Sequence, residues 1–122
     1  MSGLTPAELL IIREGLGLGV DELGVLLGVQ DRTIRRWHMG ESPIPAGVEE
    51  QLREVTAEAD RMVEAGVAEF ILEHDPVVVV FRHDEALWAS DPMFAAYPAR
   101  FHRAIVARVA REVPALRVVF AE

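Results

Sequence analysis

The chain has 122 residues, a length that suits one compact domain or a small domain followed by an oligomerisation unit. It contains no cysteine, which excludes disulfides, thiolate metal sites and cysteine nucleophiles, and its longest apolar run, residues 77–81, is too short to cross a bilayer. The formal net charge of −8 argues against a nucleic-acid-binding protein, but residues 1–45 contribute little of it, with four arginines against six acidic residues.

Residues 6–14 and 20–27 are predicted to form the first two helices. Thr5 is a good N-cap for the first of them, and Glu8 lies three residues later, as in a capping box. Gly28 ends the second helix and opens a tight turn. The pattern therefore predicts two short helices, the second of which leads through this turn into the next segment.

A third helix is predicted over residues 31–39. Its apolar residues Ile34 and Trp37 are spaced to face a core, which leaves the polar side chains outward. These outward residues are Arg32, Thr33, Arg35 and Arg36. Two short helices joined by a tight turn can lay the first across a DNA backbone and the second in the major groove, so this region predicts sequence-specific DNA binding.

A long helix is predicted from residue 46 to residue 73, with a bend at Gly66. Its apolar residues recur in alternating steps of four and three, a heptad-like stripe. These residues are Val48, Leu52, Val55, Ala59 and Met62. Such a stripe is typical of a helix that packs along another helix.

The remainder is expected to contain a buried strand at 77–81, helices at 84–90 and 100–112, and a strand at 117–120. Two short strands are marginal by themselves and leave open edges, so we predict a dimerisation unit whose strands are completed across a twofold axis. Intramolecular packing on the long helix is the alternative. The candidate interface residues are Leu52, Val55, Met62, Val77, Val79, Phe81, Phe101 and Ile105.

The predicted fold is mainly α with a small β component. Residues 1–45 would form a helix-turn-helix DNA-binding domain. Residues 46–122 would form a C-terminal dimerisation domain, built from the long helix and a strand–helix–strand unit.

Residues 4–47 resemble the Cro/repressor-like helix-turn-helix family, whose fold is that of lambda repressor. The segments that carry the resemblance are Leu16-Gly17-Leu18, Asp21-Glu22-Leu23, Leu27-Gly28-Val29 and Thr33-Ile34-Arg35-Arg36-Trp37. The whole chain is similar to anti-CRISPR-associated phage and bacterial repressors, through the exit Glu41-Ser42-Pro43-Ile44-Pro45 and the layout of the second half. That resemblance implies a homodimer that binds an inverted repeat in the promoter of its own operon and represses it, and some members also bind RNA.

Positions in the family motif imply which side chains meet DNA. Base edges would be read by Asp31, Arg32 and Arg36, and phosphates contacted by Gln30, Thr33 and Arg35. Arginine suits the O6 and N7 atoms of guanine, and Asp31 could accept a hydrogen bond from cytosine N4. The alternative role of Asp31 is to interact with the N-terminal dipole of its own helix.

Two departures from the family pattern concern contacts near the motif. A glutamine often opens the second helix and meets a phosphate, whereas Gly19-Val20 stands here and leaves only backbone amides for that contact. A glutamate often follows the tryptophan and pairs with the arginine of the first helix. His38 stands at that position, so Glu14 and Glu41 become the candidate partners of Arg13.

Other chemistry finds little support. The four histidines (His38, His74, His83 and His102) do not pair at helical spacing, and no glycine-rich phosphate loop or nucleophile elbow is present. We therefore expect no metal, no cofactor, no enzymatic activity, no small-molecule substrate and no membrane partner.

The expected partners are double-stranded DNA and a second copy of the chain, with RNA open as a further ligand. The N-terminus lacks the layout of a signal peptide, so the expected location is the cytoplasm of a bacterial or phage-infected cell. Two alternatives stay open. One is an antitoxin or interaction module whose C-terminal unit binds a protein partner, and the other is a helix-turn-helix used only for protein contacts.

Overall fold

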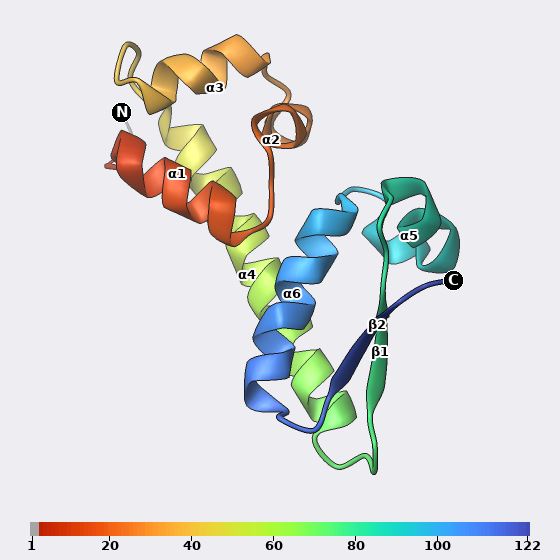
Figure 1. The fold of residues 1–122 in the computed structure, drawn as a ribbon. Helices are drawn as coiled ribbons and strands as arrows, with labels where there is room; N and C mark the ends of the chain where they lie inside the picture. The colour runs from red at the N-terminus through yellow and green to blue at the C-terminus, as the bar shows by residue number, and fades with distance from the viewer. Residues whose placement is uncertain (1–2) are drawn as a thin grey trace. The chain divides into compact units, whose positions relative to one another are not determined.

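The computed structural model describes residues 3–122, and in this range six α-helices and one 3₁₀ helix accompany two strands (Figure 1). The chain forms two compact units, one extending to Ala57 and the other starting at Glu58. The division falls inside the long helix α4 (Ala46–Phe70). The predicted boundary between a DNA-binding and a dimerisation domain, after residue 45, stays a prediction.

The first unit begins with α1 (Pro6–Gly15), α2 (Val20–Leu27) and α3 (Asp31–His38), each within one residue of its predicted bounds. The capping box is confirmed, because the Thr5 hydroxyl accepts a hydrogen bond from the Glu8 amide at 3.1 Å. The Glu8 carboxylate in turn accepts from the Thr5 amide at 2.8 Å. Local capping therefore fixes where the first helix starts.

The core of this unit draws on all four of its helical segments. Ile34 and Trp37 of α3 are buried as predicted, and the first part of α4 buries its apolar stripe as well. The buried hydrophobic residues are Leu9, Leu16, Leu18, Leu23, Ile34, Trp37, Ile44, Val48, Leu52 and Val55. The α4 stripe up to Val55 is thus used inside the single chain.

The second unit continues from the end of α4 through two strands and three short or medium helices. Its elements are β1 (Val77–Val80), α5 (Asp84–Ser90), the 3₁₀ helix η1 (Pro92–Phe94), α6 (Ala99–Glu112) and β2 (Arg117–Phe120). The strands pair in parallel, from Val77 opposite Arg117 to Val80 opposite Phe120. A parallel pair needs a long connection, and the segment containing α5, η1 and α6 provides it (Figure 1).

The face of the sheet that carries Val80 is covered over β1 alone, because Val118 and Phe120 of β2 are 44% and 41% exposed on that same face. Val80 is 5% exposed, whereas Val77 and Val79 are 50% and 42% exposed, and Val119 beside them is 42% exposed. The prediction of a buried strand is therefore wrong for this outward face. The reason is that α6 packs against β1 from one side, while no described element covers the other.

Gly66 allows a close contact between two helices. The helix α4 runs through Gly66 without interruption, and the bend there stays a prediction. A Cβ at this position would lie 2.8 Å from Val109 Cγ2 of α6. The glycine therefore lets the two helices pack closely.

Replacing Gly66 by alanine is expected to lower the free energy of unfolding by about 1 kcal/mol, because the methyl group overlaps Val109. Gly47, in the same helix, is the matched control, since a Cβ there would meet nothing within 4 Å. Gly47→Ala should stabilise by up to about 1 kcal/mol. Chemical denaturation measures both, and equal stabilisation by the two substitutions would contradict a tight contact at Gly66.

Candidate nucleic-acid interface

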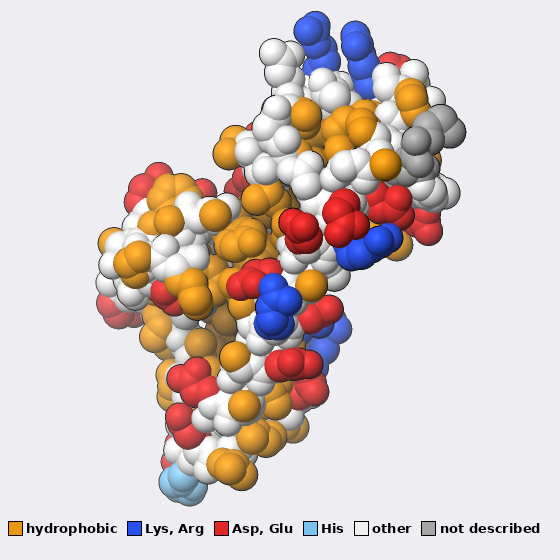
Figure 2. All heavy atoms as spheres, turned by 180° about the vertical axis from the view of Figure 1, so that it is seen from behind, with side chains coloured by type: hydrophobic (Ala, Val, Ile, Leu, Met, Phe, Trp, Pro, Cys, Tyr) orange, Lys and Arg blue, Asp and Glu red, His pale blue; other side chains and the backbone are white. Residues whose placement is uncertain are grey.

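The exposed face of α3 carries the candidate DNA-reading side chains. Ile34 and Trp37 are 0% and 4% exposed, and they fix the rotation of the helix about its axis. The opposite side of the helix is therefore turned to solvent, and its arginines are exposed. They are Arg32, Arg35 and Arg36. Figure 2 shows arginine side chains that project from the surface of this unit.

The angle between α2 and α3 is set by two glycines. Gly28 adopts a left-handed conformation with φ of 71°, which a residue with a side chain adopts only at a cost. A Cβ on Gly24 would lie 2.7 Å from the Val29 carbonyl oxygen, and the Val29 amide donates to the Gly24 carbonyl at 2.9 Å. Gly24 was missed by sequence reasoning, although a glycine inside a regular helix is a signal of close packing.

The first turn of α3 contains an ion pair that bears on two candidate contacts. The Arg35 guanidinium lies 3.9 Å from the Asp31 carboxylate, and both side chains are about half exposed. Arg32 and Arg36 form no ion pair with any described residue. Of the phosphate candidates, Gln30 is exposed and Thr33 is half-buried.

A family model described as Aca2/YdiL-like matches residues 4–113. The chain belongs to the Aca2/YdiL-like family. Membership confirms the resemblance to anti-CRISPR-associated proteins and is consistent with a regulator of that kind. No match to a curated protein is significant.

In this Aca2/YdiL-like chain, Arg13 pairs with His38 and with the backbone of Leu18. The Arg13 Nε–H donates to His38 Nε2 at 3.2 Å, and its Nη1 donates to the Leu18 carbonyl at 2.9 Å. The expectation that Glu14 or Glu41 would be the partner is therefore wrong. The histidine at the departing position accepts the hydrogen bond itself, and so links α1 to the end of α3.

The contact requires a neutral His38. Because Nε2 accepts from Arg13, the ring proton is assigned to Nδ1, which is buried close to the backbone of Pro6. Burial and the charge of Arg13 lower the pKa of His38 from its ordinary 6.5, while the Pro6 backbone and Glu14 act in the opposite direction. Protonation of Nε2 would turn this acceptor into a second donor facing Arg13.

The first unit is therefore expected to lose stability as the pH falls below 6.5. The unfolded chain binds a proton at His38 near pH 6.5, whereas the folded chain resists it until a lower pH, so acid favours unfolding through this window. The measurement is urea denaturation between pH 7.5 and 5, with an NMR titration of the His38 ring. His38→Gln keeps an acceptor without titrating, and should remove this part of the pH dependence.

If the stability of His38→Gln still depends on pH, we expect His102 of the other unit to be the cause. His102 also has a lowered pKa, chiefly because of burial, so its contribution has the same sign. An NMR-measured pKa for His38 at or above 6.5 would contradict the account.

The start of α2 is already capped by a carboxylate. The Glu22 side chain accepts a hydrogen bond from the Gly19 amide at 2.8 Å. Its negative charge lies at the helix end where a phosphate would otherwise be favoured. The proposed use of these amides for a phosphate therefore has a competitor in the free protein.

The candidate interface residues divide by exposure. Within the single chain, five are buried: Leu52, Val55, Phe81, Phe101 and Ile105. Met62 is half-buried, and Val77 and Val79 are exposed on the outward face of the sheet. The interface role of all eight stays a prediction, and of the eight only Val77 and Val79 are exposed in the single chain.

The described part of the chain contains no group of three or more His, Asp and Glu side chains able to hold a metal ion. None of its helices has both the length and the apolar character needed to cross a membrane.

Proposed function

We propose that this Aca2/YdiL-like protein is a homodimeric, sequence-specific DNA-binding repressor that recognises an inverted repeat in a promoter, its own among the candidates. In this proposal α2, the turn at Gly28 and α3 act as a helix-turn-helix. Repression would follow from exclusion of polymerase at an overlapping site.

One observation carries the proposal, namely the pair of exposed arginines without carboxylate partners on α3. Arg32 and Arg36 lie one helical turn apart, on a helix whose other side is anchored by Ile34 and Trp37. A guanidinium held in this way can bind the O6 and N7 atoms of guanine in a bidentate manner. Rigid support of the reading helix keeps that geometry in register with the bases.

The acidic net charge of the chain is compatible with DNA binding at α3. Acidic side chains gather along the exposed face of α4, where arginines pair with several of them (Figure 2). Repulsion from this face lowers non-specific affinity for DNA, because that affinity is electrostatic. Selection between sequences depends on the base contacts of α3, which this repulsion leaves unchanged.

The proposal includes a dimer because a single short helix contacts few base pairs. Val77, Val79 and Val119 form an exposed apolar strip on a two-stranded sheet, a form that is marginal by itself. A second copy would cover this strip and place two α3 helices on the two halves of a repeat.

The decisive experiment is selection of binding sites from random oligonucleotides with the purified full-length protein. The expected product is a palindrome whose half-sites lie about 34–36 Å apart, one helical turn, or a multiple of it. Enrichment of no sequence at low salt would refute the proposal, and RNA hairpins added as competitors would measure whether RNA shares the surface.

The ion pair with Arg35 gives Asp31 a role other than base reading, and these two roles predict opposite results for Asp31→Asn. If Asp31 mainly holds Arg35 by their ion pair, its neutralisation frees Arg35 for a phosphate and strengthens binding to all sequences. We expect this result, with an increase of less than about 1 kcal/mol because the pair is exposed. Loss of preference at a single cytosine, measured by competition with base-substituted operators, would instead assign Asp31 to base reading.

A second candidate function draws on the same apolar strip. An antitoxin or interaction module would use Val77, Val79 and Val119 to bind a different protein. Co-purification of one stoichiometric partner, together with a monomeric state of the isolated chain, would favour this function over the homodimer.

A further inference from the structure

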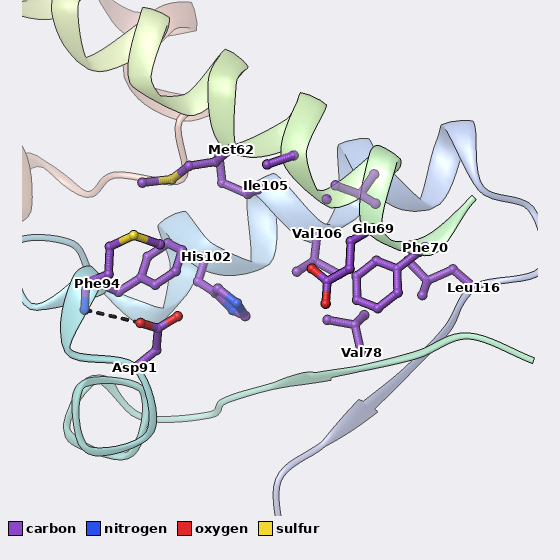
Figure 3. A pocket seen from close by; sticks show the side chains of 14 residues that line it. Met62, Glu69, Phe70, Val78, Asp91, Phe94, His102, Ile105, Val106 and Leu116 are labelled. Carbon is purple, nitrogen blue, oxygen red and sulfur yellow. Dashed lines mark hydrogen bonds between the residues drawn. The ribbon is translucent and has the colours of Figure 1, made fainter. Parts of the chain in front are cut away.

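The second unit contains a cavity of about 340 Å³ between α4, β1, η1 and α6 (Figure 3). Small-molecule sites have volumes of roughly 300–1,000 Å³, so the space is large enough for a compact ligand. Aliphatic, thioether and aromatic side chains form most of its wall. They include Met62, Phe70, Val78, Phe94, Ile105 and Val106.

The charged part of the wall has one sign. Glu69 of α4 and Asp91 at the start of η1 both line the cavity, whereas no arginine does, and the chain contains no lysine. Figure 3 shows the His102 ring between these two carboxylates. The carboxylates of the wall therefore favour a cation over an anion.

His102 adds an unused hydrogen-bonding atom. Its Nδ1 is buried and has no partner among the described residues. The ring is held in place by an edge-on contact with Phe94, at 4.9 Å between centroids, and a tilted contact with Phe81 at 5.9 Å. A buried polar atom without a partner is costly, and a ligand that supplied one would relieve that cost.

The protonation state of His102 fits an acceptor role. Burial lowers the pKa of His102 from its ordinary value and Arg103 acts in the same direction, while Asp91 opposes them. Arg103 lies outside the cavity wall and donates to the Phe81 carbonyl. The ring is thus neutral at pH 7 and has a lone pair to offer.

We propose that this cavity is a binding site for a small amphipathic amine, whose aromatic or branched aliphatic body packs against the apolar wall. Its ammonium group would lie near Asp91 and Glu69 and donate a hydrogen bond to His102. The site goes beyond DNA recognition and does not depend on it, because every lining residue belongs to the second unit.

The test uses probes that share one body and differ in charge. Phenylethylamine is the cationic probe, 2-phenylethanol the neutral one and 3-phenylpropanoate the anionic one, with isopentylamine as a second amine. Each is titrated into the full-length protein while the methionine methyl groups and the His102 ring are followed by NMR. At least one amine should saturably shift Met62, Met93 and His102, the alcohol should bind more weakly, and the acid should not bind. Met39, outside the cavity, should not move.

Two substitutions, combined in one protein, remove the negative charge with little change in shape. The double variant Glu69→Gln and Asp91→Asn should weaken amine binding by about tenfold or more and leave alcohol binding unchanged. Asp91→Asn keeps the side-chain oxygen that accepts from the Met93 amide. The matched control, Glu64→Gln with Glu73→Gln, changes the net charge equally at residues outside the cavity.

Two results would overturn the proposal. One is equal binding of all probes, or no saturable shift with either amine at millimolar concentration. The other is amine binding that disappears as the chain dimerises, followed by sedimentation at increasing protein concentration. In that case a second copy of the chain fills the cavity.

Discussion

Replacing Arg36 by alanine should weaken operator binding by about 1–3 kcal/mol and relax selection at one base position. Arg36 is exposed on α3 and forms no ion pair within the described chain, so its removal leaves the folded protein nearly unchanged. The loss then reports a bidentate contact with a base. Fluorescence anisotropy with the selected operator and its single-base variants measures both effects.

Two further variants separate base reading from general electrostatics. Arg35→Ala should weaken binding about equally for all sequences and lower the slope of affinity against salt by about one. Arg111→Ala removes the same charge from α6, in the other unit, and should have little effect. If Arg36→Ala behaves like Arg111→Ala, α3 does not read DNA through this side chain.

Much of the helical fold is predictable because its signals are local. The capping box at Thr5, the turn at Gly28 and the spacing of Ile34 and Trp37 each act within a few residues, and α1, α2 and α3 lie within one residue of their predicted bounds. The identity of the exposed arginines on α3 follows from the same spacing. Capping and periodicity therefore predicted which side chains α3 exposes, whereas their assignment to bases or phosphates rests on the family resemblance.

The features that sequence reasoning missed depend on contacts between distant residues. Four consecutive valines in β1 have no alternation, so they could reveal neither the parallel pairing nor the uncovered face. The close packing of Gly66 on Val109 joins residues far apart in the chain. The cavity beside His102 is likewise made by four elements together, and no single segment encodes it.

The uncovered sheet face leads to the second prediction, which concerns assembly. Parallel sheets are normally covered on both faces, yet Val79 and Val119 lie side by side in the outward layer, each 42% exposed. The outer edge of β2 is also open, because the Arg117 and Ala121 amides donate to the carbonyls of Pro76 and Val80, on the β1 side, and the alternate amides point away. Both features suit pairing with a second copy of this unit.

The double variant Val79→Arg and Val119→Arg should therefore convert a dimer into a folded monomer. Its affinity for the full inverted repeat should fall by about 10²–10⁴-fold, because the second half-site is no longer linked to the first. Sedimentation measures the assembly, circular dichroism the fold, and anisotropy the affinity. Leu72→Arg is the matched control, since Leu72 is 93% exposed and lies outside both the sheet and the α2–α3 motif. A double variant that stays dimeric would move the interface to another surface. One that is monomeric but binds the repeat with full affinity would break the link between dimerisation and recognition.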